Sequence, residues 1–209
     1  MKATALLLCS GGLDSTTLAY WLCERDTRFV PLFFNYGQHC VEKELDTLKK
    51  VLPAKIVDSI TYLDISCVFQ GSESRLIVEP DLWNEYVTDN DLYIPYRTLL
   101  FFSIGAAYAQ THNILEVYSG FINSNHAKEI DCSASFLNNL DELAETVGPV
   151  RFQMPFRYWS KSQVVAEAVR LNVPIGLTYS CQLFSDTPCG ACPNCVERIN
   201  AIEANKGVA

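Results

Sequence analysis

The sequence predicts an α/β fold in which helices cover both faces of a twisted parallel sheet, followed by a small C-terminal lobe. Short apolar runs alternate with segments of helical periodicity, which is typical of βαβ units with right-handed crossovers. A glycine-containing turn follows the first apolar run, and four cysteines lie between Cys181 and Cys195. We therefore expect a main α/β domain over residues 1–177 and a cysteine lobe over residues 178–209.

The first half of the predicted sheet comes from two apolar runs. Residues 3–9 predict a buried strand, because this run is shorter than the ~7–15 apolar residues of a secretory signal. A helical pattern follows over residues 13–25. Residues 29–34 predict the second strand, and leucines at helical spacing predict a helix over residues 41–52, which Pro53 ends.

The next elements are less regular. We expect a third strand over residues 55–63 and a loop-rich stretch over residues 67–92, which is polar and weakly periodic. Pro95 precedes a long apolar helix over residues 97–111, and residues 115–119 predict the fourth strand.

The remaining main-domain elements are helical. Residues 121–135 are polar and irregular, and residues 136–147 have an amphipathic helical pattern. Ser160 predicts the start of another helix, because Gln163 stands three residues later and would complete a capping box.

Composition narrows the function class. Of the 209 residues, 49% are hydrophobic and 19% are charged, which excludes a disordered chain. The net charge of −8 argues against a broad grip on nucleic acid, which requires Lys and Arg facing phosphates. No stretch approaches the ~18 apolar residues of a membrane span. With nine cysteines, an odd number, a closed disulfide framework is disfavoured, so we expect a cytoplasmic protein.

The cysteine cluster predicts a metal site. Cys189, Cys192 and Cys195 are each separated by two residues, and Cys181 lies upstream. Four thiolates form a closed tetrahedral set for Zn²⁺ that leaves no position for a reactive water, so the ion would be structural. An iron–sulfur cluster is the alternative, since it also uses four thiolates. The other five cysteines are expected to be small core residues: Cys9, Cys23, Cys40, Cys67 and Cys132.

The glycine turn predicts an anion site. The sequence Ser10-Gly11-Gly12-Leu13-Asp14-Ser15 joins the first strand to the first helix, at the edge of a parallel sheet where ligands bind. Two glycines allow backbone N–H groups to approach an anion, and the helix N-terminus adds donors and partial positive charge. The alternative is an ordinary strand-to-helix turn in which Ser15 or Asp14 caps the helix.

The six residues of this turn resemble the S-G-G-x-D-S signature of the pyrophosphatase-loop ATP enzymes, which cleave ATP to AMP and pyrophosphate. Together with the cysteine cluster, they make the chain similar to the 7-cyano-7-deazaguanine synthase family over nearly its whole length. The segments that carry this resemblance, besides the turn and the cysteines, are Asn35-Tyr36-Gly37-Gln38, Glu44-Leu45, Ile94-Pro95-Tyr96-Arg97-Thr98, Ser160-Lys161, Thr178-Tyr179-Ser180-Cys181 and Arg198.

The resemblance implies an adenine nucleotide α-hydrolase fold, which is Rossmann-like, and an ATP-dependent carbon–nitrogen ligase. The family converts 7-carboxy-7-deazaguanine and ammonia to 7-cyano-7-deazaguanine, using ATP and Mg²⁺. Residues Ser10, Gly11, Gly12, Leu13, Asp14 and Ser15 would then hold pyrophosphate. Arg97 and Lys161 would act at the α-phosphate or acyl group, and Asp14 would order Mg²⁺ or cap the helix. The resemblance also implies a homodimer as one option.

The predicted substrate loop departs from the family pattern. Over residues 123–136, only Asp131, Cys132 and Phe136 clearly match. Asp131 would bind the guanine-like edge of the substrate. Thr98 also replaces the asparagine that the family has beside Arg97.

These departures from the family pattern are also compatible with three alternative functions. The altered loop could serve a protein or another amine, joined to the deazaguanine acid through an amide, a divergent role with parallels in antiphage operons. A tRNA-modifying adenylase is a further alternative, and the net charge of −8 argues against it. A non-catalytic zinc module is opposed by the complete glycine turn.

Overall fold

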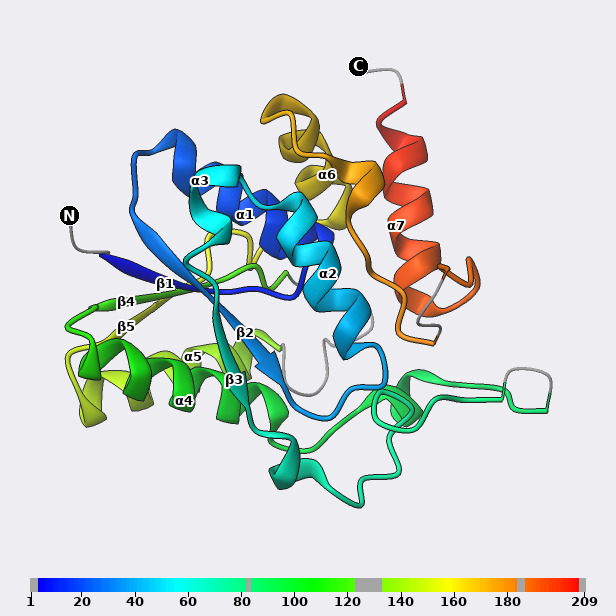
Figure 1. Cartoon of the computed structure of the whole chain (residues 1–209), viewed down its shortest axis with the longest axis horizontal. Helices are drawn as coiled ribbons and strands as arrows, with labels where there is room; N and C mark the ends of the chain where they lie inside the picture. The colour runs from blue at the N-terminus through cyan, green and yellow to red at the C-terminus, as the bar shows by residue number, and fades with distance from the viewer. Residues whose placement is uncertain (1–3, 82–83, 123–132, 184–186, 207–209) are drawn as a thin grey trace.

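The computed structural model describes residues 4–81, 84–122, 133–183 and 187–206. Five parallel strands form one sheet in the order β3-β2-β1-β4-β5 (Figure 1). The strands are β1 (Ala5–Leu8), β2 (Phe29–Asn35), β3 (Thr61–Asp64), β4 (Glu116–Ser119) and β5 (Arg151–Gln153). The parallel Rossmann-like sheet confirms the predicted fold class.

Helices cover both faces of the sheet, as predicted. On one face lie α1 (Leu13–Glu24), α2 (Val41–Val51), α3 (Ala54–Val57) and α6 (Lys161–Arg170), and α7 (Pro193–Ala204) packs beside α6 (Figure 1). On the other face lie α4 (Arg97–Thr111) and α5 (Ala134–Val147). Among the described residues, no helix is long and apolar enough to cross a membrane.

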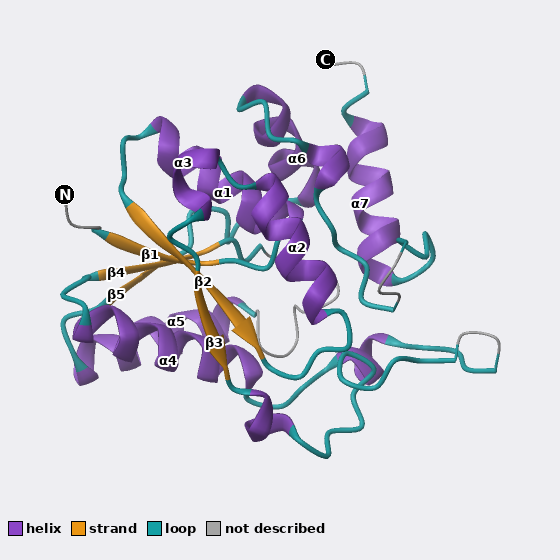
Figure 2. Cartoon of the chain, in the orientation of Figure 1, coloured by secondary structure: helices purple, strands orange, loops and turns teal. Residues whose placement is uncertain are grey.

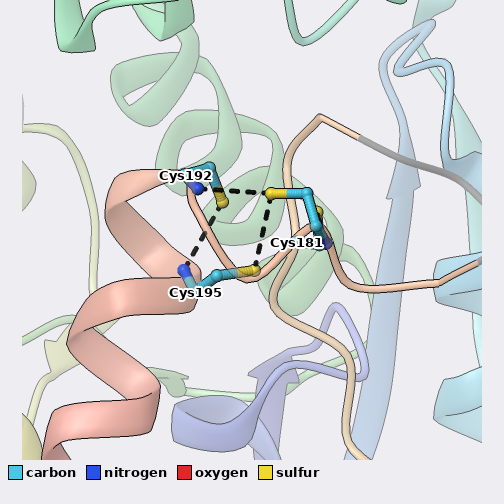
Figure 3. Close-up of side chains that lie close together, drawn as sticks. Cys181, Cys192 and Cys195 are labelled. Atoms are coloured by element: carbon cyan, nitrogen blue, oxygen red, sulfur yellow. Dashed lines mark hydrogen bonds between the residues drawn. The ribbon is translucent and has the colours of Figure 1, made fainter. Parts of the chain in front are cut away.

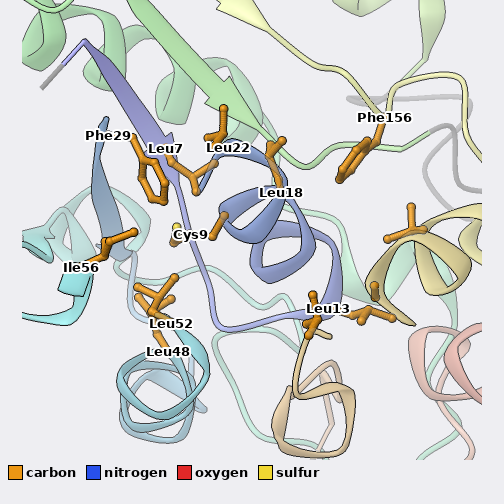
Figure 4. Close-up of a cluster of buried hydrophobic side chains, with 14 of the residues drawn as sticks. Leu7, Cys9, Leu13, Leu18, Leu22, Phe29, Leu48, Leu52, Ile56 and Phe156 are labelled. Atoms are coloured by element: carbon orange, nitrogen blue, oxygen red, sulfur yellow. The ribbon is translucent and has the colours of Figure 1, made fainter. Parts of the chain in front are cut away.

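The two faces of β1 build two separate cores, because successive strand residues point to opposite sides. Leu7 packs with α1 and α2, in a cluster that includes Leu18 and Leu48 (Figure 4). Leu6 and Leu8 pack with α4 and α5. Full burial of one such leucine contributes about 2 kcal/mol to stability, so the central strand is fixed from both sides.

One predicted strand differs from the structure. The prediction of a strand over residues 55–63 is wrong in its first half, where α3 forms one helical turn after Pro53. Only Thr61–Asp64 forms β3, an edge strand with alternating burial. The stretch between β3 and α4 is mostly loop, as predicted, with short 3₁₀ turns at Ser66–Phe69 and Asp89–Leu92 (Figure 2).

The strand order places a crevice between β1 and β4. The chain moves outward from β1 through β2 to β3, and then returns to form β4 on the other side of β1. At such a reversal, the loops at the carboxyl ends of the two strands diverge and leave room for a ligand. The loop after β1 is the glycine turn, and β4 is followed by Gly120 and Phe121.

Candidate functional site

The glycine turn passes directly against α2. Gly11 has a positive φ of +76°, and a Cβ at this position would lie 2.8 Å from the Glu44 carbonyl oxygen and 2.9 Å from the Leu48 nitrogen. The turn is closed by two hydrogen bonds, from the Ser10 N–H to Ser15 Oγ and from the Gly12 N–H to Ser10 Oγ, both 3.3 Å. Only glycine fits this position without displacing backbone atoms.

The alternative in which Ser15 or Asp14 caps α1 is wrong. The N-cap is Gly12, and no side chain of the residues that the structure describes caps the helix. Ser15 Oγ instead donates to the Gly12 carbonyl oxygen at 3.3 Å. The N-terminal turn therefore keeps the unsatisfied donors and the partial positive charge that favour an anion.

Lys161 lies close to the turn although 147 residues separate it from Asp14. Its Nζ donates to Asp14 Oδ2 at 2.7 Å, and the two side chains are 11% and 26% exposed. Lys161 is the first residue of α6, whose capping box between Ser160 and Gln163 is formed as predicted. Asp14 Oδ1 is buried and accepts no hydrogen bond within the described part of the chain.

Arg97 enters the same cleft from the first turn of α4. Its guanidinium carbon lies 5.6 Å from the centre of the Tyr36 ring, which fits a cation–π contact. The preceding residue, Tyr96, has a left-handed backbone with φ of +62°. Such a conformation is costly for a tyrosine, and it sets the direction in which the chain enters α4 at Arg97.

The cleft has a volume of about 370 Å³ and lies at the crevice between β1 and β4. Ser10, Gly12, Asp14 and Ser15 line it together with Arg97 and Lys161. The structure thus brings the predicted anion turn and both predicted cations to one cavity. The residue after β4 lies directly against the first turn of α1, because a Cβ at Gly120 would lie 2.9 Å from Asp14 C and Ser15 N.

A polar pair, the buried Gln38 and the half-buried Glu44, also lines this cleft. Gln38 Nε2 donates to Glu44 Oε2 at 2.9 Å and to the Phe34 carbonyl oxygen at 3.1 Å. Burial raises the pKa of Glu44 to about 7, although the bonds from Gln38 and Cys40 and the charge of Arg97 act in the opposite direction. In the sequence, both residues stand out only as parts of the family resemblance.

The four predicted cysteine ligands converge. Their Sγ atoms all lie within 4.8 Å of one another, and three of the four side chains are buried. Figure 3 shows the side chains of Cys181, Cys192 and Cys195 close together. The Cys189 and Cys195 sulfurs are 4.0 Å apart, near the ~3.8 Å expected between thiolates on tetrahedral zinc. Backbone N–H groups of Cys192 and Cys195 donate to the Cys189 and Cys192 sulfurs at 3.2 and 3.4 Å. This cluster could hold a metal ion such as zinc.

The cysteine segment also forms part of the cleft. Cys192 caps α7 by accepting from the Cys195 N–H, and Pro193 is the first helical residue. Asn194 and Glu197 on this helix line the cleft. The Tyr179 N–H donates to the Gly11 carbonyl oxygen at 3.2 Å, which ties the segment to the glycine turn. The domain boundary after residue 177 stays a prediction.

The predicted substrate residues are only partly visible. Asp131 and Cys132 lie outside the described residues. Phe136 lies in the first turn of α5, where its ring packs against the core that contains Leu137 and Leu140. The roles of all three residues stay predictions.

The chain is similar to known proteins of one family over nearly its whole length. The family described as "Queuosine biosynthesis protein QueC" matches residues 4–206. The 7-cyano-7-deazaguanine synthase of Sulfurimonas denitrificans is 32% identical over 207 residues, covering 94% of this chain and 91% of the relative. That of Marinobacter nauticus is 32% identical over 213 residues, covering 98% and 95%.

A solved structure described as a predicted subunit of tRNA methyltransferase from Methanocaldococcus jannaschii has a TM-score of 0.52 at 13% identity. It covers 80% of this chain and 74% of its own, and it shows a shared fold alone. The family match spans both the glycine turn and the cysteine cluster. The chain therefore belongs to the QueC family of queuosine biosynthesis proteins.

Proposed function

We propose that the protein is an ATP-dependent carbon–nitrogen ligase that converts 7-carboxy-7-deazaguanine and ammonia to 7-cyano-7-deazaguanine. The observation that carries this proposal is the meeting of the glycine turn, Lys161 and Arg97 in one cleft. An adenylating enzyme must stabilise negative charge that builds on phosphate oxygens, and donors fixed in advance do so most effectively. The names of the relatives support the same product.

The reaction divides into two activations. In the first, a substrate carboxylate oxygen attacks the α-phosphorus of ATP, and pyrophosphate leaves. Ammonia then attacks the acyl carbon, AMP leaves, and loss of a proton gives the amide. In the second, the amide oxygen attacks a second ATP and releases pyrophosphate. Loss of AMP and of the two nitrogen protons leaves the nitrile.

Each group in the cleft has a distinct task in this scheme. The turn from Ser10 to Ser15 binds pyrophosphate through backbone N–H groups and hydroxyls. Lys161 and Arg97 contact the α-phosphate or the acyl oxygen. The ion pair with Asp14 holds the Lys161 ammonium beside the turn before ATP binds, which limits reorganisation during the reaction.

Two metal ions belong to this proposal. The buried oxygen Asp14 Oδ1, without a hydrogen-bond partner among the described residues, fits the oxygen ligands that Mg²⁺ prefers. When bound, Mg²⁺ would neutralise phosphate charge. Zn²⁺ bound by Cys181, Cys189, Cys192 and Cys195 would be structural, because the four thiolates occupy all four positions of tetrahedral coordination and leave none for a water or substrate.

Mass spectrometry of small products tests the reaction. The protein is incubated with ATP, Mg²⁺, 7-carboxy-7-deazaguanine and ammonia, and we expect the nitrile with two AMP formed per product. Asp14→Asn should lower turnover about a hundredfold, whereas Asp46→Asn, an exposed exchange on α2, should not. One AMP per product without any nitrile, or full activity in Asp14→Asn, would contradict the proposal.

A different amine acceptor is the second candidate. The sequence of residues 123–136 keeps only Asp131, Cys132 and Phe136 of the family pattern, which favours a changed acceptor rather than a changed activation. In that case a protein amine attacks the acyl-adenylate and the reaction stops at an amide. Intact-mass measurement of co-expressed neighbouring gene products would show the adduct, and its absence alongside nitrile formation excludes this candidate.

A further inference from the structure

Glu44 places a carboxylate in the wall of the cleft. It lies in the first half of α2, beside the glycine turn, and its side chain lines the cavity. Within the described part of the chain, two donors reach it: Gln38 Nε2 to Oε2 at 2.9 Å, and Cys40 Sγ to Oε1 at 3.5 Å. A carboxylate offers about four lone-pair sites, so each oxygen keeps capacity for one more donor.

Gln38 fixes the carboxylate and has no N–H group left to donate to a ligand. Both of its amide hydrogens are used, one by Glu44 and one by the Phe34 carbonyl oxygen, and its Oε1 accepts from the Tyr36 N–H at 2.9 Å. Gln38 is only 2% exposed. The Glu44 carboxylate is therefore held in one orientation before any ligand arrives.

The surroundings of Glu44 suit a flat heterocycle. Phe34 and Phe101 stack at 4.7 Å, Tyr36 contacts Phe101 at 5.4 Å, and all three line the same cleft. Aromatic walls with one fixed polar group are typical of sites that bind a ring and read its edge. The titratable or charged groups that act on Glu44 here are Cys40 and Arg97.

Burial of this carboxylate is unfavourable without a ligand, which fits a raised pKa of about 7. Donors supplied by a ligand would satisfy the remaining lone pairs and stabilise the ionised form. The chemistry that fits is a pair of adjacent N–H donors. The guanine-like edge of a deazaguanine presents such a pair, N1–H and the 2-amino group, whereas the adenine edge pairs a donor with an acceptor.

We propose that Glu44 determines specificity for the deazaguanine ring by accepting hydrogen bonds from its N1–H and 2-amino groups. This inference rests on the proposed function and assigns to Glu44 the edge recognition that the sequence analysis gave to Asp131. ATP also carries a base N–H donor, its 6-amino group, so the experiment must distinguish binding of the deazaguanine ring to Glu44 from binding of the adenine ring.

Equilibrium binding to the full chain provides the test. Dissociation constants are measured by calorimetry for 7-carboxy-7-deazaguanine, for its analogue without the 2-amino group, and for ATP. We expect Glu44→Gln to weaken binding of the deazaguanine acid about tenfold or more, because hydrogen bonds to a charged group are lost, and to leave ATP binding within about twofold. Glu42→Gln, an exposed exchange on the same helix, should change neither constant.

The analogue provides an independent readout. Wild-type protein should bind it about tenfold more weakly than the complete acid, and Glu44→Gln should bind the two ligands alike. Thermal melting shows whether Glu44→Gln folds. If it does not, the inference is tested by comparing the affinities of the wild-type protein for the acid and for the analogue without the 2-amino group. Equal wild-type affinity for both ligands overturns the inference, as does a variant that weakens ATP binding while leaving the acid unchanged.

Failure of the reaction and failure of this inference give different results. Tight, 2-amino-dependent binding of the acid without product would contradict the proposed reaction and support the role of Glu44. Nitrile formation by wild type, together with unchanged affinity of Glu44→Gln for the acid, would overturn the role of Glu44 and support the reaction.

Discussion

Substitution of Gly11 tests how tightly the glycine turn is packed against α2. Replacing it by alanine imposes two separate penalties: a positive φ of +76°, and a Cβ within 2.9 Å of backbone atoms of α2. The left-handed conformation costs a non-glycine residue about 1–2 kcal/mol. Overpacking against backbone costs a further ~1–3 kcal/mol, so we expect Gly11→Ala to lower the free energy of unfolding by about 2–5 kcal/mol.

Three other glycines separate these penalties. Gly71 has a φ of +86° and open space around it, so its alanine variant carries the conformational penalty alone. Gly120 has no positive φ but would place a Cβ 2.9 Å from the backbone of Asp14, so its variant carries the steric penalty alone. Gly176 carries neither penalty and serves as the control.

Urea denaturation followed by circular dichroism measures all four variants. We expect Gly71→Ala to lose about 1–2 kcal/mol, Gly120→Ala about 1–3 kcal/mol, and Gly176→Ala less than about 0.5 kcal/mol. Gly11→Ala should be the least stable of the four. A Gly11→Ala protein no less stable than Gly71→Ala would refute the reasoning, because α2 would then have room for the added methyl group.

Three further predictions follow from the same site. Since burial raises the pKa of Glu44 from 4.5 to about 7 in the folded state, wild type should lose about 3 kcal/mol of stability relative to Glu44→Gln as the pH rises from 4.5 through 7. Urea midpoints across this range check the sign, and parallel profiles for the two proteins contradict it. Cys192→Ser should lower both the zinc content, measured with a chromophoric chelator, and the melting temperature; unchanged zinc content sinks the assignment. Ser160→Ala should cost about 1 kcal/mol, because the α6 cap is lost, as judged by chemical denaturation against a Ser103→Ala control at an exposed position of α4; equal stability of the two variants argues against the cap.

Most of the sheet could be predicted from the sequence, because β1 and β2 are buried on both faces and read as continuous apolar runs. The edges of the sheet could not. Residues of α3 resemble a strand locally, but Pro53 starts a helical turn there, and β3 begins only at Thr61. The last strand, β5, is three residues long, too short for a periodic signal.

The candidate site likewise contains some residues that could be predicted from the sequence and others that could not. The glycine turn and the cysteine ligands are local motifs, so their residues could be identified from spacing alone. Lys161 and Arg97 could be named from the resemblance and from their places beside predicted helix starts, but their approach to the turn depends on how α4 and α6 pack. Glu44 and Gln38 carry no sequence signal of their own beyond following β2, whose carboxyl end lies at the same edge of the sheet as that of β1.

The backbone hydrogen bond between Tyr179 and Gly11 has a consequence for biosynthesis of the protein. Ribosomes make a chain from its amino end, so all five strands emerge before the first of the clustered cysteines. The glycine turn can therefore form on a nascent chain while one wall of its cleft is still missing. That wall arrives with α7, whose start is fixed by Cys192 and Cys195. If the four cysteines hold a metal ion, as we propose, that ion can bind only after the other walls of the cleft have been synthesised.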